Sequence, residues 1–231
     1  PLATDHTKGV IGWTAIGEYK EAVAKNDAIR QPYLDKLETM SAQEIINDPE
    51  MLNFANSSTK ALFGDNCAAC HGSNGQGIAG MFPVLLDDDW LFGGTVSDIA
   101  TSIASGRKGN MPAHDLDDAQ INLLTDFVIA ASTGQATQEG WDAYQAAGCF
   151  ACHGADAKGN KWMGSANLTD AIWRFGSDRE SVMRTIKYGV NQDGVDGTQN
   201  GVMPAFGDKL SENDIKLLTV KVWSLGGGQS E

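Results

Sequence analysis

Two copies of one short motif hold all four cysteines of the chain. They are CAACH at residues 67–71 and CFACH at residues 149–153. In the spacing C-x-x-C-H, the two thiols form thioether links to the vinyl groups of a c-type haem, and the histidine takes one axial position on the iron. The sequence therefore predicts two covalently attached haem c groups. Their attachment residues are Cys67, Cys70, His71, Cys149, Cys152 and His153.

A second axial ligand is expected from a methionine downstream of each motif. Met111 and Met203 each stand in a Gly-x-Met-Pro sequence, 40 residues after His71 and 50 residues after His153. Methionine opposite histidine raises the reduction potential of haem iron. With both axial positions filled, the iron has no site for substrate, so this ligand set predicts one-electron transfer. Loop length allows either methionine to serve either haem.

Other interpretations of these residues fit the spacing less well. A zinc site needs four ligands in one place, and two pairs 82 residues apart do not supply them. A redox-active thiol pair is the other alternative for C-x-x-C. A single methionine is more often a loop or core residue than a ligand, but the repeated Gly-x-Met-Pro context favours ligation. His114 competes as an axial ligand, although we expect it to face solvent.

Residues beside the motifs are expected to support the haems. Pro83 lies 12 residues after His71, where its carbonyl can accept the imidazole N–H, and Ala166 takes the equivalent place in the second copy. Met81 and Met163 each follow their histidine by ten residues. That distance is too short to reach the opposite face of a haem, so we expect them to pack around the macrocycle.

Composition narrows the class of partner and the compartment. The 231 residues include 17 basic and 30 acidic side chains, giving a net charge of -13. This charge makes nucleic acid and anionic membrane surfaces poor partners and favours a redox partner with a basic surface. No run of 18 apolar residues is present, and the chain opens Pro1-Leu2, so we expect a processed form or fragment. Covalent haem attachment predicts a periplasmic location.

An internal repeat divides the chain. The motif histidines lie 82 positions apart, and Trp90 and Trp173 lie 83 apart. Extra Gly, Asn and Asp residues between positions 189 and 201 read as a surface loop. We expect three parts, with a short linker at residues 131–138 between the second and the third. They are an N-terminal arm at 1–55, a first cytochrome c domain at 56–134 and a second one at 135–231.

Apolar periodicity predicts an all-α fold. With the repeated haem motif, we expect two tandem class I cytochrome c-like domains with an N-terminal extension. Each half shows a helix before its first cysteine, a middle helix and a final helix. The final helices are expected to begin after Asp117 and Ser211, and an additional helix in the arm after Ser41. An apolar cluster around residues 10–16 is expected to wrap the first domain or to lead from an anchor.

Together these residues resemble the two-haem cytochrome c subunit of cbb3-type cytochrome c oxidases. The resemblance rests on the Gly-Val-Ile-Gly-Trp-Thr stretch at 9–14, the repeated haem motif with Leu-Thr-Asp-x-x-Trp at 168–173, and the Met-Pro pair closing each half. It covers nearly the whole chain. The first half departs from the pattern with Leu86-Asp87-Asp88, and the loop before Met203 is longer.

The resemblance implies a non-catalytic electron-transfer subunit of an oxidase complex. In that family the subunit takes electrons from a donor cytochrome c and passes them to a one-haem subunit and then to the catalytic haem–copper subunit. The family implies an N-terminal membrane anchor, absent here, and a soluble part on the periplasmic face of the bacterial inner membrane. It also implies crossed ligation, with Met111 serving the haem on His153 and Met203 the haem on His71.

Two other functions fit the same residues. A free periplasmic dihaem cytochrome c would carry electrons between complexes without belonging to one. A dihaem enzyme, such as a peroxidase, or a gas sensor would need an open axial position. The two Met-Pro loops argue against that position.

Overall fold

The computed structural model describes residues 12–230, and helix dominates them. The only regular sheet in this part of the chain is one short antiparallel pair of strands. The elements are α1 (Ala15–Thr39), α2 (Ala42–Asn47), α3 (Pro49–Asn66), α4 (Ala68–His71), α5 (Val96–Ser105), β1 (Arg107–Lys108), α6 (Asp118–Ala131), α7 (Gln138–Ala146), α8 (Phe150–His153), α9 (Arg179–Tyr188), β2 (Val202–Met203) and α10 (Glu212–Trp223).

The helix starts predicted from capping residues are confirmed. Ser41, Asp117 and Ser211 each accept a hydrogen bond from the backbone N–H three residues on, and the side chain at that position bonds back to the cap. These reciprocal pairs satisfy backbone donors that a helix cannot pair internally. The middle helices α5 and α9 bury the predicted apolar positions, among them Ile99 and Ile186.

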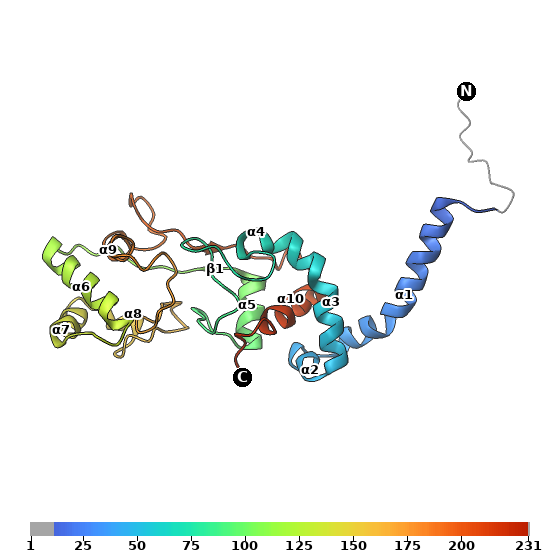
Figure 1. The fold of residues 1–231 in the computed structure, drawn as a ribbon, viewed down its shortest axis with the longest axis horizontal. Helices are drawn as coiled ribbons and strands as arrows, with labels where there is room; N and C mark the ends of the chain where they lie inside the picture. Colours follow the sequence, from blue (N-terminus) through green and yellow to red (C-terminus); the bar gives the residue numbers. More distant parts are fainter. Residues whose placement is uncertain (1–11, 231) are drawn as a thin grey trace, which may run out of the picture.

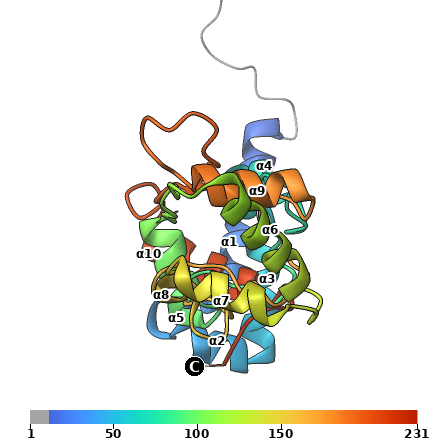
Figure 2. The same cartoon turned by 90° about the vertical axis from the view of Figure 1, so that its left-hand side faces the viewer.

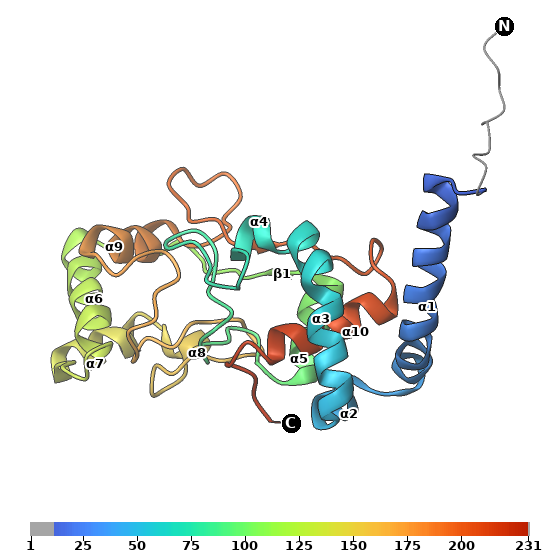
Figure 3. The same cartoon turned by 45° about the vertical axis from the view of Figure 1, so that its right-hand side comes forward.

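The final helices of the two sequence repeats are exchanged in space. The last helix, α10, packs against α3 and α5, whereas α6 packs against α7 and α9. Figures 1 and 3 show α6–α9 gathered at one end and α3, α4, α5 and α10 together in the middle. We call α3, α4, α5, β2 and α10 the first packing unit and α6–α9 the second. Each unit therefore combines elements from both predicted ranges, 56–134 and 135–231.

Each unit has its own apolar core. In the first, Phe63 and Ile103 pack with Leu218 of α10. In the second, Ile121 and Phe127 of α6 pack with Tyr144 of α7. The Phe127 ring lies 5.1 Å from the Tyr144 ring, centroid to centroid. The exchanged helices thus carry core residues, which fixes the exchange by burial rather than by loop contacts.

The strands and one isolated bridge carry the chain between the units. Arg107 of β1 lies opposite Met203 of β2. Met111 forms an antiparallel bridge with Val190, which follows α9. Figure 2 looks onto the end of the molecule formed by α6–α9, the second unit that these connections reach. Both Gly-x-Met-Pro loops therefore cross from one unit to the other.

The N-terminal arm divides into a packed part and a projecting part. Leu37, Ile45 and Met51 are buried against Leu217 and Val220 of α10. The beginning of α1 extends away from the body (Figures 1 and 3). In the predicted cluster at 10–16, Trp13 and Ile16 are exposed, and residues 10 and 11 lie outside the described residues. The packed part of the arm covers a helix that belongs to the second sequence repeat.

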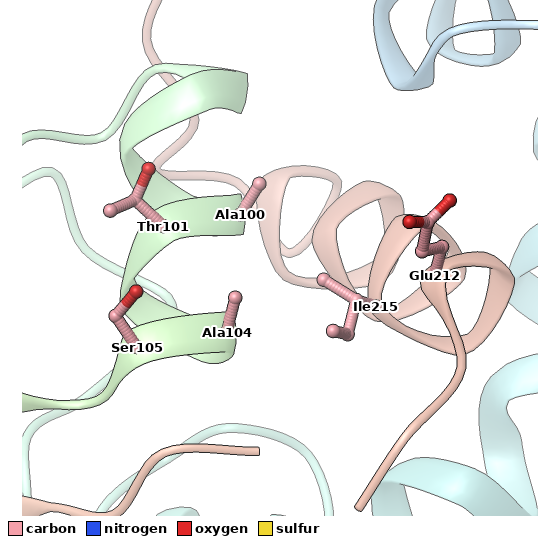
Figure 4. A pocket seen from close by; sticks show the side chains of 6 residues that line it. All are labelled: Ala100, Thr101, Ala104, Ser105, Glu212 and Ile215. Carbon is pink, nitrogen blue, oxygen red and sulfur yellow. The ribbon is translucent and has the colours of Figure 1, made fainter. Parts of the chain in front are cut away.

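A shallow open pocket of about 360 Å³ lies between α5 and α10. Small side chains of α5 face Glu212 and Ile215 across it (Figure 4). Neither this pocket nor one of about 400 Å³ beside Phe54 is lined by a cysteine or histidine. The residues that could bind a cofactor therefore lie at the repeated motifs and not in these two pockets.

Candidate haem-binding sites

The first motif places His71 at the end of α4. Its ring Nδ1 lies 3.1 Å from the carbonyl oxygen of Pro83. Because a carbonyl only accepts, Nδ1 carries the proton, and Nε2 is left unprotonated and able to bind a metal. The backbone N–H of Gly77 also donates to the His71 carbonyl at 2.8 Å. The loop after the motif thus holds both the ring and the backbone of His71.

The second motif repeats this arrangement. His153 Nδ1 lies 2.8 Å from the carbonyl oxygen of Ala166. Ser165 adds a hydrogen bond from its hydroxyl to the Cys152 carbonyl at 2.6 Å, tying the loop to the motif. Ala166 lacks the rigid ring that Pro83 provides at the first site. The structure keeps the bond, since Ser165 fastens the loop by a different means.

The surroundings of both histidines favour the neutral form, which is the form that binds a metal. Burial lowers the pKa of His71, the bond to Pro83 opposes that shift, and the charge of Arg174 lowers the pKa further. Burial likewise lowers the pKa of His153, opposed by the bond to Ala166 and reinforced by His114. A ring that stays neutral offers its Nε2 lone pair to iron.

The cysteines lack the character of a redox-active pair. All four are unpaired thiols of intermediate exposure. Burial, reinforced by Cys70, raises the pKa of Cys67 to about 11, and burial also raises the pKa of Cys149. Redox-active C-x-x-C pairs depend on a lowered thiol pKa. The raised pKa of the first cysteine in each motif argues against thiol exchange there.

Met203 lies in the first packing unit, although it belongs to the second repeat. It packs against the core cluster that also contacts Cys67, Ala68 and Trp90. The backbone at Gly106 closes against the carbonyl of Met203: a Cβ on Gly106 would lie 2.5 Å from that oxygen. Of the two methionines, Met203 is thus the one placed beside the first motif.

Met111 lies against the second packing unit. Val190 donates its backbone N–H to the Met111 carbonyl at 2.9 Å, and Met111 donates to the Val190 carbonyl at 3.3 Å. His114, three residues on, is near enough to lower the pKa of His153 by its charge. We expected His114 to face solvent, but it is half-buried in this loop. The Met111 loop is therefore next to the second motif.

The residues present fit a haem group at each motif. Each site combines two free thiols, a neutral histidine with Nε2 unprotonated, and a methionine loop from the other repeat. Apolar side chains beside the motifs are exposed, as expected for residues that a macrocycle would cover. They are Ile78, Met81, Phe150 and Met163. Within residues 12–230, no three His, Cys, Asp or Glu side chains gather as a group able to hold a bare metal ion.

Comparison with known proteins gives the family. The model of "Cytochrome C oxidase, cbb3-type, subunit III" matches residues 55–128 and again residues 135–220. The cbb3-type cytochrome c oxidase subunit FixP of Azorhizobium caulinodans is 39% identical, over 99% of this chain and 80% of that protein. The subunit CcoP of Cereibacter sphaeroides is 36% identical, over 99% of this chain and 81% of that protein.

The chain belongs to the cbb3-type oxidase subunit III family. The resemblance seen in the sequence is thereby confirmed, as is the all-α fold of repeated cytochrome c domains. Membership of this cytochrome c family means that the chain binds haem c covalently. Among the described residues of this chain, no helix is long and apolar enough to span a bilayer.

Sequence reasoning missed three features of the sites in this family member. Arg174 of the second repeat reaches the first site, and Gly106 and Gly189 press against the two methionine carbonyls. The glycines have a detectable signal in the sequence, because they lie 83 positions apart and each follows the middle helix of its repeat. In the structure both have positive φ, +68° and +67°. Arg174 has no such signal, because its repeat counterpart is Leu91.

Proposed function

We propose that this chain is the electron-transfer subunit of a cbb3-type oxidase and carries two haems c. Cys67, Cys70 and His71 would hold one of them and Cys149, Cys152 and His153 the other. Met203 would complete the first site and Met111 the second. When bound, haem c supplies a one-electron redox couple.

The observation that carries this proposal is the delivery of a methionine loop to each motif from the opposite repeat. Met203 shares a cluster with Cys67, and the Met111 backbone is bonded to Val190 in the second unit. A site with protein ligands on both sides leaves no position for a substrate. This supports electron transfer over catalysis at these sites.

The same exchange gives the chain a role in holding the two sites together. Each unit takes its last helix and its methionine from the other repeat, so neither can move far without breaking the other's core. The fixed Nδ1–carbonyl bonds keep both imidazoles oriented through a change of charge at the iron. Rigid surroundings of this kind lower the reorganisation energy of one-electron transfer.

In the proposed complex, a donor cytochrome c delivers electrons to this subunit on the periplasmic side. The one-haem subunit and the catalytic haem–copper subunit receive them in turn. The net charge of -13 suits donors and subunits with basic docking surfaces.

Oxygen uptake tests this function directly. The haem-loaded chain is added to a cbb3 oxidase stripped of subunit III, with ascorbate-reduced cytochrome c as donor. We expect oxygen uptake to rise with added chain and to saturate. If the donor reduces the chain but uptake stays at the stripped level, the free-carrier alternative replaces this proposal. Turnover of peroxide by the chain alone would instead indicate a dihaem enzyme.

A further inference from the structure

One arginine of the second repeat lies at the first haem site. Arg174 stands in the segment Trp173-Arg174-Phe175-Gly176, which repeats Trp90-Leu91-Phe92-Gly93 of the first half. Its Nη1 donates to the carbonyl of Met81, 93 residues away in the chain. The side chain thus crosses from its own repeat to the loop that follows the first motif.

That loop is the one that holds the proximal histidine. Met81 donates its backbone N–H to Ile78 at 2.9 Å, and Ile78 donates to Phe82 at 3.0 Å, closing a tight turn. The next residue, Pro83, supplies the carbonyl for His71. The guanidinium is therefore bonded two residues from the group that orients the His71 ring.

The other amino group of the same guanidinium, Nη2, lies near the loop that carries Met203. A Cβ built on Gly201 would lie 3.4 Å from Arg174 Nη2, and Gly201 is two residues before Met203. Arg174 therefore lies between the loop that supports His71 and the loop that carries Met203.

The charge is not neutralised by the protein. The four ion pairs found among residues 12–230 all involve other cations: Lys36, Lys161, Arg179 and Lys187. The guanidinium packs 5.1 Å from the centre of the Phe175 ring, and burial lowers its pKa. A part-buried cation without a paired carboxylate keeps a stronger field than an exposed one, because solvent screens it less.

We infer that Arg174 is a positioning and charge-supplying residue that raises the reduction potential of the haem held by His71, and not that of the haem held by His153. A nearby positive charge disfavours ferric haem, which carries one more positive charge than ferrous haem. In the repeat, the corresponding residue Leu91 is uncharged. This arginine therefore distinguishes the two haems electrostatically. The inference rests on the proposed two-haem function.

The test is a spectroelectrochemical titration of the complete haem-loaded chain. R174L copies the residue of the first repeat, R174K keeps the charge, and R184L is the matched control. Arg184 also donates to a backbone carbonyl, that of Gly197, but lies on α9 of the second unit. The titration should show two redox components, one for each haem. M203H and M111H identify which component belongs to which haem, since replacing methionine by histidine lowers the reduction potential of the haem it ligates.

We expect R174L to lower the reduction potential of only the component that M203H lowers. R174K should retain most of the original potential, and R184L should change the potential of neither component. Haem content and far-ultraviolet circular dichroism establish that each variant is folded. A shift in the M111H component, equal shifts in both, no shift, or an R174K value equal to that of R174L would overturn the inference. If M203H and M111H themselves move nothing, the proposed ligation fails, and that result is distinct from failure of the arginine's role.

Discussion

Met111 and Val190 exchange both of their backbone hydrogen bonds, at 2.9 and 3.3 Å, although they lie in different sequence repeats. This pairing holds the first Gly-x-Met-Pro loop against the second unit. Arg107 and Met203 form the corresponding pair at the first unit. Methionine crossing and helix exchange are thus one feature of the fold, because each methionine loop leads directly into the helix that is exchanged.

The glycines behind the methionines offer a selective way to disturb each site. A Cβ on Gly106 would collide with the Met203 carbonyl, and one on Gly189 with the Met111 carbonyl. We expect G106A to weaken the methionine–iron charge-transfer band of one haem and G189A that of the other. Near-infrared absorption of the oxidised protein measures the band.

Gly134 is the matched control for both substitutions. It shares the positive φ, at +71°, but a Cβ there would meet nothing within 4 Å. G134A should cost about 1–2 kcal/mol of stability from backbone strain alone and leave both bands intact. If G134A weakened a band as much as G106A does, displacement of the methionine would not be the cause.

Cutting the chain at residues 133–135 should not release two separate fragments. Thr133, Gly134 and Gln135 are exposed, so a protease site introduced there is accessible. Because α6 is buried in the second unit and α10 in the first, the two fragments share both cores. We expect the nicked, haem-loaded protein to elute from a sizing column as one species. Elution as two smaller species would contradict the exchanged packing.

Tyr144 is expected to stabilise the second unit through its hydroxyl. The side chain is 1% exposed, and its O–H donates to the Gly154 carbonyl beside His153 at 2.5 Å. Y144F leaves that carbonyl without the hydroxyl, so the free energy of unfolding should fall by about 1–3 kcal/mol. Denaturant titration measures it, with the exposed Tyr19 as control in Y19F. A Y144F protein as stable as Y19F would contradict the assignment.

The raised pKa of Asp89 predicts that its contribution to the free energy of unfolding decreases as pH rises. Burial, followed by the charges of Asp170, Asp87 and Asp88, raises its pKa to about 6. The folded state therefore binds the proton more tightly than the unfolded state, whose carboxyl titrates near 4. Between about pH 4 and 6, the contribution of Asp89 to stability falls as the group ionises.

The variant D89N removes this contribution. We expect it to be more stable than the parent above pH 6 and to show a flatter stability profile between pH 4 and 6, by denaturant titration at each pH. The exposed Asp115 supplies the control, D115N. A D89N profile parallel to that of the parent would show that Asp89 titrates normally.

The sequence predicts the histidine bonds and the helix starts, which depend on short stretches of chain. It does not predict which helices from the two repeats pack together. C-x-x-C-H and the 12-residue interval to Pro83 fix the histidine bond, because both depend on short stretches of chain. Capping residues fixed the starts of α6 and α10 for the same reason. The exchange of these helices was not derivable from the residues, since the two apolar faces have similar patterns and the linker permits either partner. Arg174 was missed because its contact with Met81 spans 93 residues.

The most direct test of the account is an optical spectrum of the purified haem-loaded chain, oxidised and reduced, with and without carbon monoxide. Both proposed sites have a histidine and a methionine available, so we predict two low-spin haems, a methionine–iron charge-transfer band, and no change on adding the gas. A haem that binds carbon monoxide readily would mean that a methionine is labile or absent. That result would contradict the central claim that this chain only transfers electrons.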